Sequence, residues 1–278
     1  MTHVIPKQQT VTWASWVYGE EGVALDDPAE HFHEASAISP NVVDHRVPGR
    51  QFLQHERLQV STVRAVKRHP HLPTVPLPPP TLPPESYSQL VARRGSQRAF
   101  ARGTVSLEQV STLLQTAYGV NRASVDGRPL RAVPSGGALY PLELYPVASN
   151  VDGLEPAVYH FDPLAAQLER LHELREGRSA LGALTVYPEL LTESAVIFFV
   201  TAVFWRTRFK YGQRGYRFAL LEAGHLGQNL LLSAEALGLA AVPVGGFYDR
   251  LVNRFLGVDG VHEAAVYAFS VGPRVDAS

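Results

Sequence analysis

The feature that most constrains the fold is a long helical segment at residues 216–238, YRFALLEAGHLGQNLLLSAEALG. Apolar residues recur along it at helical spacing, and the opposite face is also largely apolar. A helix that is apolar nearly all round has to be buried on every side. Gly238 ends the predicted helix, and Gly224 and Gly227 would let another helix approach closely. In a chain of 278 residues, burial against a second subunit fits this pattern as well as burial in the chain's own core.

Composition excludes several classes of function. The chain has no cysteine, which rules out disulfides, thiol nucleophiles and thiolate-held metal centres, so any redox chemistry needs a bound cofactor. A formal net charge of -1 gives no steering toward nucleic acid or an anionic membrane. No signal peptide is visible, and the longest apolar run, residues 195–205, is too short to span a bilayer. We therefore expect a soluble cytoplasmic protein that binds neither nucleic acid nor membrane.

A proline-dense stretch, HLPTVPLPPPTLPPE at residues 71–85, divides the chain. So many prolines forbid a helix or a central strand, and they favour an extended connector. We predict an N-terminal region of uncertain role at 1–72, a connector at 73–85 and a main domain at 86–278. Trp13 and Trp16 suggest that part of the N-terminal region packs.

The main domain mixes helices and strands without regular alternation, which favours the α+β class. A short helix is predicted to end near Gly95, and a second helix is predicted from an N-cap at Ser106 to a stop at Gly119. Residues 195–204, AVIFFVTAVF, have the composition of a strand covered on both faces. The other predicted strands are ELYPVAS, AVYHFDP, QLERLHE, AVPVGGF and AAVYAFSVG.

Three segments could contact a ligand through basic side chains or bare backbone. Arginines crowd around Ser96 in ARRGSQRAF, which suits a phosphate or a solvated basic face. Pro-Ser-Gly-Gly at 134–137 and Gly245–Gly246 could bring backbone close to a ligand, or could be a turn and a bulge. No GxGxxG pattern and no P-loop is present, so Rossmann or ATP binding lacks support.

Titratable residues offer a further candidate in FKYGQRGYR at 209–217. Lys210 beside Tyr211 could form a general acid–base pair if burial lowers the lysine pKa, or the segment could be a solvated strand-to-helix loop. His31 and His33 could share one strand face but lack a third ligand, so no metal site is expected. His225 is predicted to be a hydrogen-bonded core residue.

In their order along the chain, these segments resemble the flavin-dependent nitroreductase superfamily. RAVPSGGALYPLELY, KYGQRGYR and EAGHLGQNLLLSAEALGL are similar to the SagB/ThcOx-type dehydrogenases, which are FMN enzymes that oxidise azoline rings in ribosomally made peptides. The similarity covers residues 83–275, and FHEAS at 32–36 is loosely similar to the family's N-terminal region.

The resemblance implies an interlocked homodimer with a central, mainly antiparallel sheet flanked by helices and two FMN sites at the subunit interface. Lys210 and Tyr211 match the pair proposed as catalytic in that family. The partner subunit's chain would lay its 134–136 turn on the flavin, and Gly245–Gly246 would lie near flavin N5. The residues implied to bind FMN are Arg94, Ser96, Arg98, Pro134, Ser135, Gly136, Gly245, Gly246 and Arg274.

The implied reaction makes a thiazoline or oxazoline ring aromatic. Lys210 or Tyr211 would remove the Cα proton, a hydride would pass to flavin N5, and oxygen would regenerate FMN. A precursor peptide and a cyclodehydratase are the implied partners. The alternatives are an NAD(P)H-dependent nitro or quinone reductase, an oxidase of a small amino-acid-derived or carrier-bound metabolite, and a non-catalytic partner that keeps FMN for structure.

Overall fold

The computed structural model describes residues 28–37, 66–125 and 127–275, and the chain divides into two compact units, Met1–His45 and Arg46–Ser278. In the first unit, helix α2 spans Pro28–Ala35. His31 and His33 lie on this helix, so the prediction that they share a strand face is wrong. Trp13 and Trp16 lie outside the described residues.

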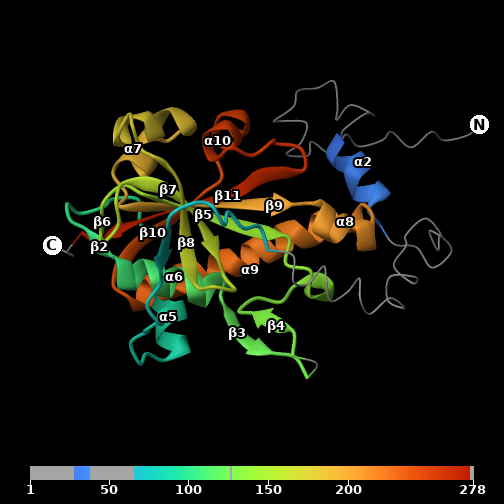
Figure 1. Cartoon of the computed structure of the whole chain (residues 1–278), viewed down its shortest axis with the longest axis horizontal. Coiled ribbons are helices and arrows are strands. Elements are labelled where there is room, and N and C mark those ends of the chain that lie inside the picture. The colour runs from blue at the N-terminus through green and yellow to red at the C-terminus, as the bar shows by residue number, and fades with distance from the viewer. Residues whose placement is uncertain (1–27, 38–65, 126, 276–278) are drawn as a thin grey trace, which may run out of the picture. The chain divides into compact units, whose positions relative to one another are not determined.

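The second unit is built on a seven-stranded sheet with the order β1-β8-β7-β5-β9-β11-β10 (Figure 1). Every neighbouring pair in this sheet is antiparallel, which confirms the predicted α+β class and antiparallel sheet. The strands are β1 Thr74–Pro76, β5 Leu142–Ala148, β7 Ala157–Asp162, β8 Gln167–Glu173, β9 Val196–Val203, β10 Leu239–Val244 and β11 Glu263–Pro273. Two small ladders pair β2 (Val105–Ser106) with β6 (Val151–Asp152) and β3 (Val120–Ala123) with β4 (Pro129–Arg131).

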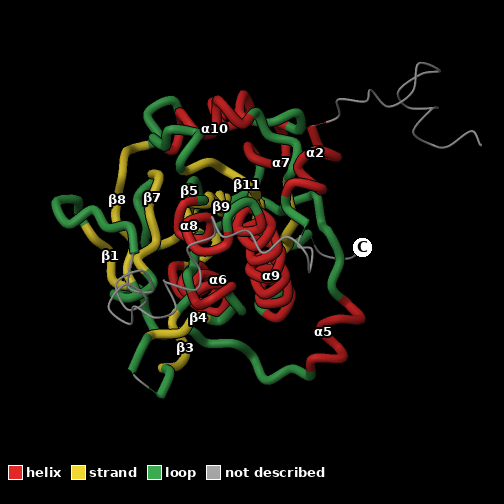
Figure 2. The backbone as a smooth tube through the Cα atoms, turned by 90° about the vertical axis from the view of Figure 1, so that its right-hand side faces the viewer, coloured by secondary structure: helices red, strands yellow, loops and turns green. Residues whose placement is uncertain are grey.

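Helices lie on both faces of the sheet. Figure 2 shows α6 and α9 on one face and α7 and α10 on the other. The helices of this unit are α5 Tyr87–Arg93, α6 Leu107–Tyr118, α7 Pro188–Thr192, α8 Trp205–Tyr211, α9 Arg214–Ala236 and α10 Asp249–Leu256, with 3₁₀ turns at Gly136–Ala138 and Arg178–Leu184. Across the part of the chain that the structure describes, no helix combines the length and apolar character needed to cross a membrane.

Helix α6 begins and ends at the capping residues that the sequence predicts. The Ser106 hydroxyl accepts the Gln109 backbone N–H, and the Gln109 side chain accepts the Ser106 N–H, which completes a capping box. At the other end, Gly119 follows the last helical residue and donates its N–H to the Gln115 carbonyl. The predicted start and stop of this helix are confirmed.

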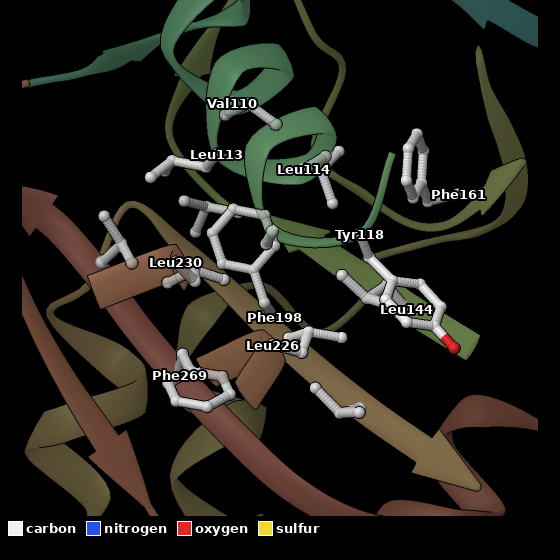
Figure 3. Packing of buried hydrophobic residues seen from close by; sticks show 14 of the residues in the cluster. Val110, Leu113, Leu114, Tyr118, Leu144, Phe161, Phe198, Leu226, Leu230 and Phe269 are labelled. Carbon is white, nitrogen blue, oxygen red and sulfur yellow. The ribbon is translucent and has the colours of Figure 1, made fainter. Parts of the chain in front are cut away.

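Strand β9 is buried on both sides, as predicted, because its side chains alternate between two apolar cores. Phe198 and Val200 face the core under α6 and α9, while Ile197 and Phe199 face the core under α7 and α10. Figure 3 shows the first core, where side chains from α6 and α9 meet those of the sheet. This sheet is the rigid frame on which the candidate site is built.

The long helix α9 is buried on one side only. A Cβ at position 227 would overlap the Phe269 ring, so Gly227 lets the helix approach strand β11 rather than another helix. On the opposite side Leu221 is 61% exposed, His225 is exposed, and a Cβ at Gly224 would meet no described atom. Burial of the whole helix in the chain's own core and a core position for His225 are therefore wrong, and burial of the exposed face against a second subunit stays a prediction.

The proline-rich connector runs along the edge of the sheet. Its residues Thr74–Pro76 form strand β1 and pair with β8 at Glu169–Gln167. This placement fits the prediction of an extended segment excluded from a central strand, because an edge strand tolerates the missing N–H of proline.

Candidate active site

The Pro134–Gly137 turn lies against the Lys210–Tyr211 pair. Gly137 has a φ of 65°, and a Cβ there would stand 2.7 Å from both Lys210 Nζ and the Tyr211 hydroxyl. A Cβ on Gly136 would stand 3.0 Å from the Phe218 ring. The structure thus brings two separately predicted segments together within one chain, and the bare backbone of the turn is what permits the contact.

Lys210 is only 7% exposed and lies in helix α8, so the alternative of a solvated loop is wrong. The helix forms because the backbone N–H groups of Arg208 and Gly212 reach the carbonyls of Phe204 and Arg208. Burial, with a smaller contribution from the charge of Arg128, lowers the pKa of Lys210. Burial raises the pKa of Tyr211, so the phenol keeps its proton.

A cavity of about 460 Å³ opens beside this pair. Phe218 connects the two, because its ring lies 4.9 Å from the Tyr211 ring and also lines the cavity. The lining residues all belong to the first turns of α9: Arg214, Arg217, Phe218, Leu220 and Leu221. The cavity thus offers two cationic and three apolar side chains, and it adjoins the Lys210–Tyr211 pair through the Phe218 ring.

A buried carboxyl, Glu222, lies under the turn and was not predicted. The Tyr118 hydroxyl donates to Glu222 Oε1 at 2.6 Å, and the Arg131 guanidinium lies 4.4 Å from the centre of the Tyr118 ring. The Ser135 hydroxyl accepts the Tyr140 backbone N–H at 2.9 Å and lies close enough to Glu222 to lower its pKa. The available sequence signal was a lone acidic residue on the apolar face of the long helix.

The predicted phosphate-binding arginines gather near the C-terminal end of α9. Arg93 and Arg274 each bond Glu235, at 2.6 Å, and this carboxylate is 3% exposed. Burial raises the pKa of Glu235, but the two arginines outweigh that effect and the net pKa is lowered. Arg94 Nε and Arg274 Nε are buried without a hydrogen-bond partner among the described residues.

Edge strand β10 connects this basic group to the Gly245–Gly246 pair. At the start of the strand, Arg274 Nη2 donates to the Leu239 carbonyl. Further along, the Gln97 N–H donates to the Ala241 carbonyl. The exposed neighbours of Gln97, Ser96 and Arg98, therefore lie beside β10. The Gly245–Gly246 pair follows the strand's last residue.

The two glycines of this pair differ in their surroundings. A Cβ on Gly246 would stand 2.8 Å from Val186, whereas a Cβ on Gly245 would meet no described atom within 4 Å. Packing within the chain therefore accounts for a glycine at 246 but leaves the backbone at 245 open.

A second buried polar cluster lies on the same sheet, around His160. Its Nε2 and Nδ1 atoms lie 2.8 Å and 2.9 Å from Glu143 and Glu169. Burial alone would lower the pKa of His160, but the two carboxylates raise it, so the imidazole is held as a cation. Burial would raise the pKa of Glu143, yet Arg206 and His160 lower it to about 2.

His69, His160 and Glu169 each offer one possible metal-ligand atom within 4.8 Å of the others. Because both ring nitrogens of His160 already pair with carboxylates, we interpret this set as an ionic network rather than as a metal site.

Comparison with known proteins identifies the class. The model of the nitroreductase family matches residues 91–273, and the chain belongs to this family. It is 33% identical over 188 residues to the nitroreductase-like protein MJ1384 of Methanocaldococcus jannaschii, covering 67% of this chain and 90% of that protein. Among solved structures, a nitroreductase-family protein of Anabaena variabilis aligns with a TM-score of 0.68 at 26% identity, over 88% of this chain and 47% of the other.

Two relatives are named for peptide processing. The chain is 30% identical to the trifolitoxin-processing protein TfxB of Rhizobium leguminosarum over 64% of its length, and 31% identical to the microcin B17-processing protein McbC of Escherichia coli over 57%. It spans 50% of TfxB and 58% of McbC, so it corresponds to roughly half of each of these relatives.

Proposed function

We propose that this protein is an FMN-dependent dehydrogenase that oxidises thiazoline or oxazoline rings of a ribosomally made peptide to thiazoles or oxazoles. The observation that carries the proposal is the contact of buried Lys210 and Tyr211 with the Pro134–Gly137 turn in a nitroreductase-family chain. Its similarity to two proteins named for processing peptide products supports a peptide substrate.

The residues along β10 fit FMN. Arg94 and Arg274 have buried Nε donors without a partner among the described residues, and Ser96 and Arg98 add a hydroxyl and an exposed cation. These donors suit a phosphate. The open backbone at Gly245 suits the approach of a flat ring system. When bound, FMN would supply the acceptor for the hydride that leaves the azoline ring.

Lys210 would act as the general base and Tyr211 as a hydrogen-bond donor. Because burial lowers the pKa of Lys210, more of its amine is neutral near pH 7 and can take the Cα proton. Because burial raises the pKa of Tyr211, the phenol keeps its proton and can donate a hydrogen bond rather than act as a base.

A homodimer would complete the site. The turn contacts α9 at Phe218, near the N-terminal end of the helix, whereas Arg93 and Arg274 are anchored at Glu235, about 25 Å further along it. We propose that FMN held along β10 of one subunit receives the turn of the other subunit. The peptide substrate and a cyclodehydratase are the proposed partners; a solved microcin synthetase complex that includes McbC contains a truncated pro-peptide.

The test is turnover of a synthetic peptide that carries one thiazoline ring, by protein reconstituted with FMN. We expect FMN to be retained through gel filtration, oxygen to be consumed, and mass spectrometry to show the loss of two hydrogens per ring. A protein that takes up no FMN, or that binds it and leaves the ring unchanged, would contradict the proposal.

An NAD(P)H-dependent nitroreductase is the second candidate, favoured by the 33% identity to MJ1384. Rapid bleaching of the flavin absorbance by NADPH, followed by reduction of a nitroaromatic compound, would support this candidate instead. Indifference to NADPH together with azoline turnover supports the first.

A further inference from the structure

Glu222 lies directly beneath the Pro134–Gly137 turn, and neither the comparisons nor the proposed mechanism gives it a role. We propose that Glu222 is a positioning residue that sets the conformation of this turn through Ser135, and that gain or loss of its proton shifts the turn. The effect on catalysis rests on the proposed function, whereas the effect on the turn stands without it.

The carboxyl group of Glu222 is enclosed by the fold. Its residue is 2% exposed, and Oε1 accepts the Tyr118 hydroxyl at 2.6 Å. The Tyr118 hydroxyl in turn accepts the Leu142 backbone N–H at 3.2 Å, which ties the carboxyl to the start of strand β5. Oε2 is buried and has no hydrogen-bond partner among the residues that the structure describes. A buried acceptor left in this way is costly, and addition of a proton removes the cost of the charge.

Helix α9 supports the turn at two consecutive points. Phe218 lies under Gly136, and Glu222 lies one helical turn further along α9. Glu222 connects to the turn through Tyr118, which donates to it and whose ring lies 6.3 Å from the Tyr140 ring. The Tyr140 N–H donates to the Ser135 hydroxyl, so this series of contacts reaches from the carboxyl to the turn. Since Gly137 abuts Lys210 and Tyr211, a shift at Ser135 is transmitted to the proposed catalytic pair.

The groups that face Glu222 come from four elements. Tyr118 comes from α6, Ser135 from the turn, Arg131 from β4 and Arg206 from α8. Burial raises the pKa of Glu222 to about 7, although all four of these groups act to lower it. Both protonation states are therefore populated near neutral pH. The ionised carboxylate accepts from Tyr118 and attracts Arg131; the neutral acid loses that attraction and becomes a donor itself.

The experiment is a pH titration of the turn glycines by NMR in the full chain without FMN. Selective ¹⁵N-glycine labelling reduces the spectrum to the glycine amides, and single glycine-to-alanine variants assign Gly136 and Gly137. We expect both amide shifts to titrate with a midpoint of about pH 7. We expect the titration to be lost in Glu222→Gln and kept in Glu189→Gln, an exposed control on α7. Turn glycines that do not titrate, or that titrate unchanged in Glu222→Gln, would overturn the proposal.

A second variant covers the case in which Glu222→Gln fails to fold. Tyr118→Phe removes a hydrogen bond that favours the ionised carboxylate, so the midpoint should move up by at least half a pH unit. An unmoved midpoint would also overturn the proposal. Because no flavin or substrate is present, these results do not depend on whether the protein oxidises azolines.

Discussion

Gly137 and Lys210 are in direct contact: a Cβ on Gly137 would stand 2.7 Å from the lysine Nζ. The same position has a φ of 65°, which L side chains rarely adopt. Two independent constraints therefore select glycine here, one from the backbone and one from the amine. The turn therefore lies directly against the Lys210 amine, and this contact can be tested by adding a single methyl group.

Gly137→Ala should reduce azoline turnover at least tenfold because the new methyl group displaces the Lys210 amine and the Tyr211 hydroxyl. Backbone strain should also cost about 1–2 kcal/mol of stability. Gly257→Ala is the matched control, since Gly257 has a φ of 72° but no described atom near its Cβ. In chemical denaturation, the control should lose a similar amount of unfolding free energy, and its azoline turnover should be unchanged. Equal turnover in both variants would rule out a role for the Gly137 contact.

Lys210→Ala should lower turnover by about 100-fold or more, the usual contribution of a positioned acid or base. Tyr211→Phe should lower turnover by a smaller factor, because it removes a donor and leaves the base. Both variants should keep FMN, measured by absorbance after gel filtration. Arg208→Ala, at an exposed position of the same helix, is the control and should be unaffected. In the wild type, turnover should rise with pH through a midpoint below the ordinary lysine value of 10.5.

Gly227→Ala and Gly224→Ala should change stability in opposite directions, although both lie in α9. At position 227 the methyl group meets the Phe269 ring, and such overpacking costs about 1–3 kcal/mol. At position 224 it meets no described atom, and alanine in a helix interior is favoured by about 1 kcal/mol over glycine. Urea denaturation measures both free energies of unfolding. A stable Gly227→Ala protein would contradict the close packing of α9 on β11.

Leu221→Asp should convert the proposed homodimer to a monomer. Leu221 is 61% exposed and its neighbour Leu220 is 42% exposed, so a charge on this face is tolerated by the single chain but not by an apolar interface. Sedimentation velocity of wild type and variant at matched concentrations provides the measurement. If the wild type is already monomeric while it turns over substrate, the two-subunit site is wrong.

The His160 network predicts how stability depends on pH. Because the pKa of His160 is raised in the folded protein, this residue adds to the free energy of unfolding. Its contribution is complete below about pH 6.5 and is lost as the pH rises through the pKa of His160 in the folded protein. Because the pKa of Glu143 is lowered in the folded protein, this residue also stabilises the fold. Its contribution is present above pH 4.5 and is lost as the pH falls toward about 2. Urea unfolding at several pH values should find the optimum between these limits. His160→Gln should cost about 3–5 kcal/mol and flatten the alkaline side, because it leaves buried carboxylates uncompensated.

Short-range signals in the sequence were enough for much of the framework. The capping residues of α6 and the composition of β9 each act within a few residues, so their positions followed from the chain alone. The family resemblance added predictions about the site that short-range signals do not give, and it indicated Lys210 and Tyr211 as the catalytic pair. Their burial, and their contact with Gly137, depend on segments far apart in sequence.

The partners of buried polar groups were beyond prediction for the same reason. The register of β7 against β8 sets His160 opposite Glu169, and the packing of α9 sets Glu222 under Ser135. A lone acidic residue on an apolar helix face gives no indication of which groups will surround it.

The residues just ahead of the connector have a consequence for shortening the chain. The backbone N–H groups of Lys67 and His69 donate to Glu143 and Glu169, and the Lys67 amine bonds Glu263 at 2.8 Å. These residues therefore supply two hydrogen bonds to the buried carboxylates of the His160 network and one positive charge to Glu263. A minimal recombinant fragment should begin ahead of residue 66, and one that begins at the first proline of the connector should be insoluble.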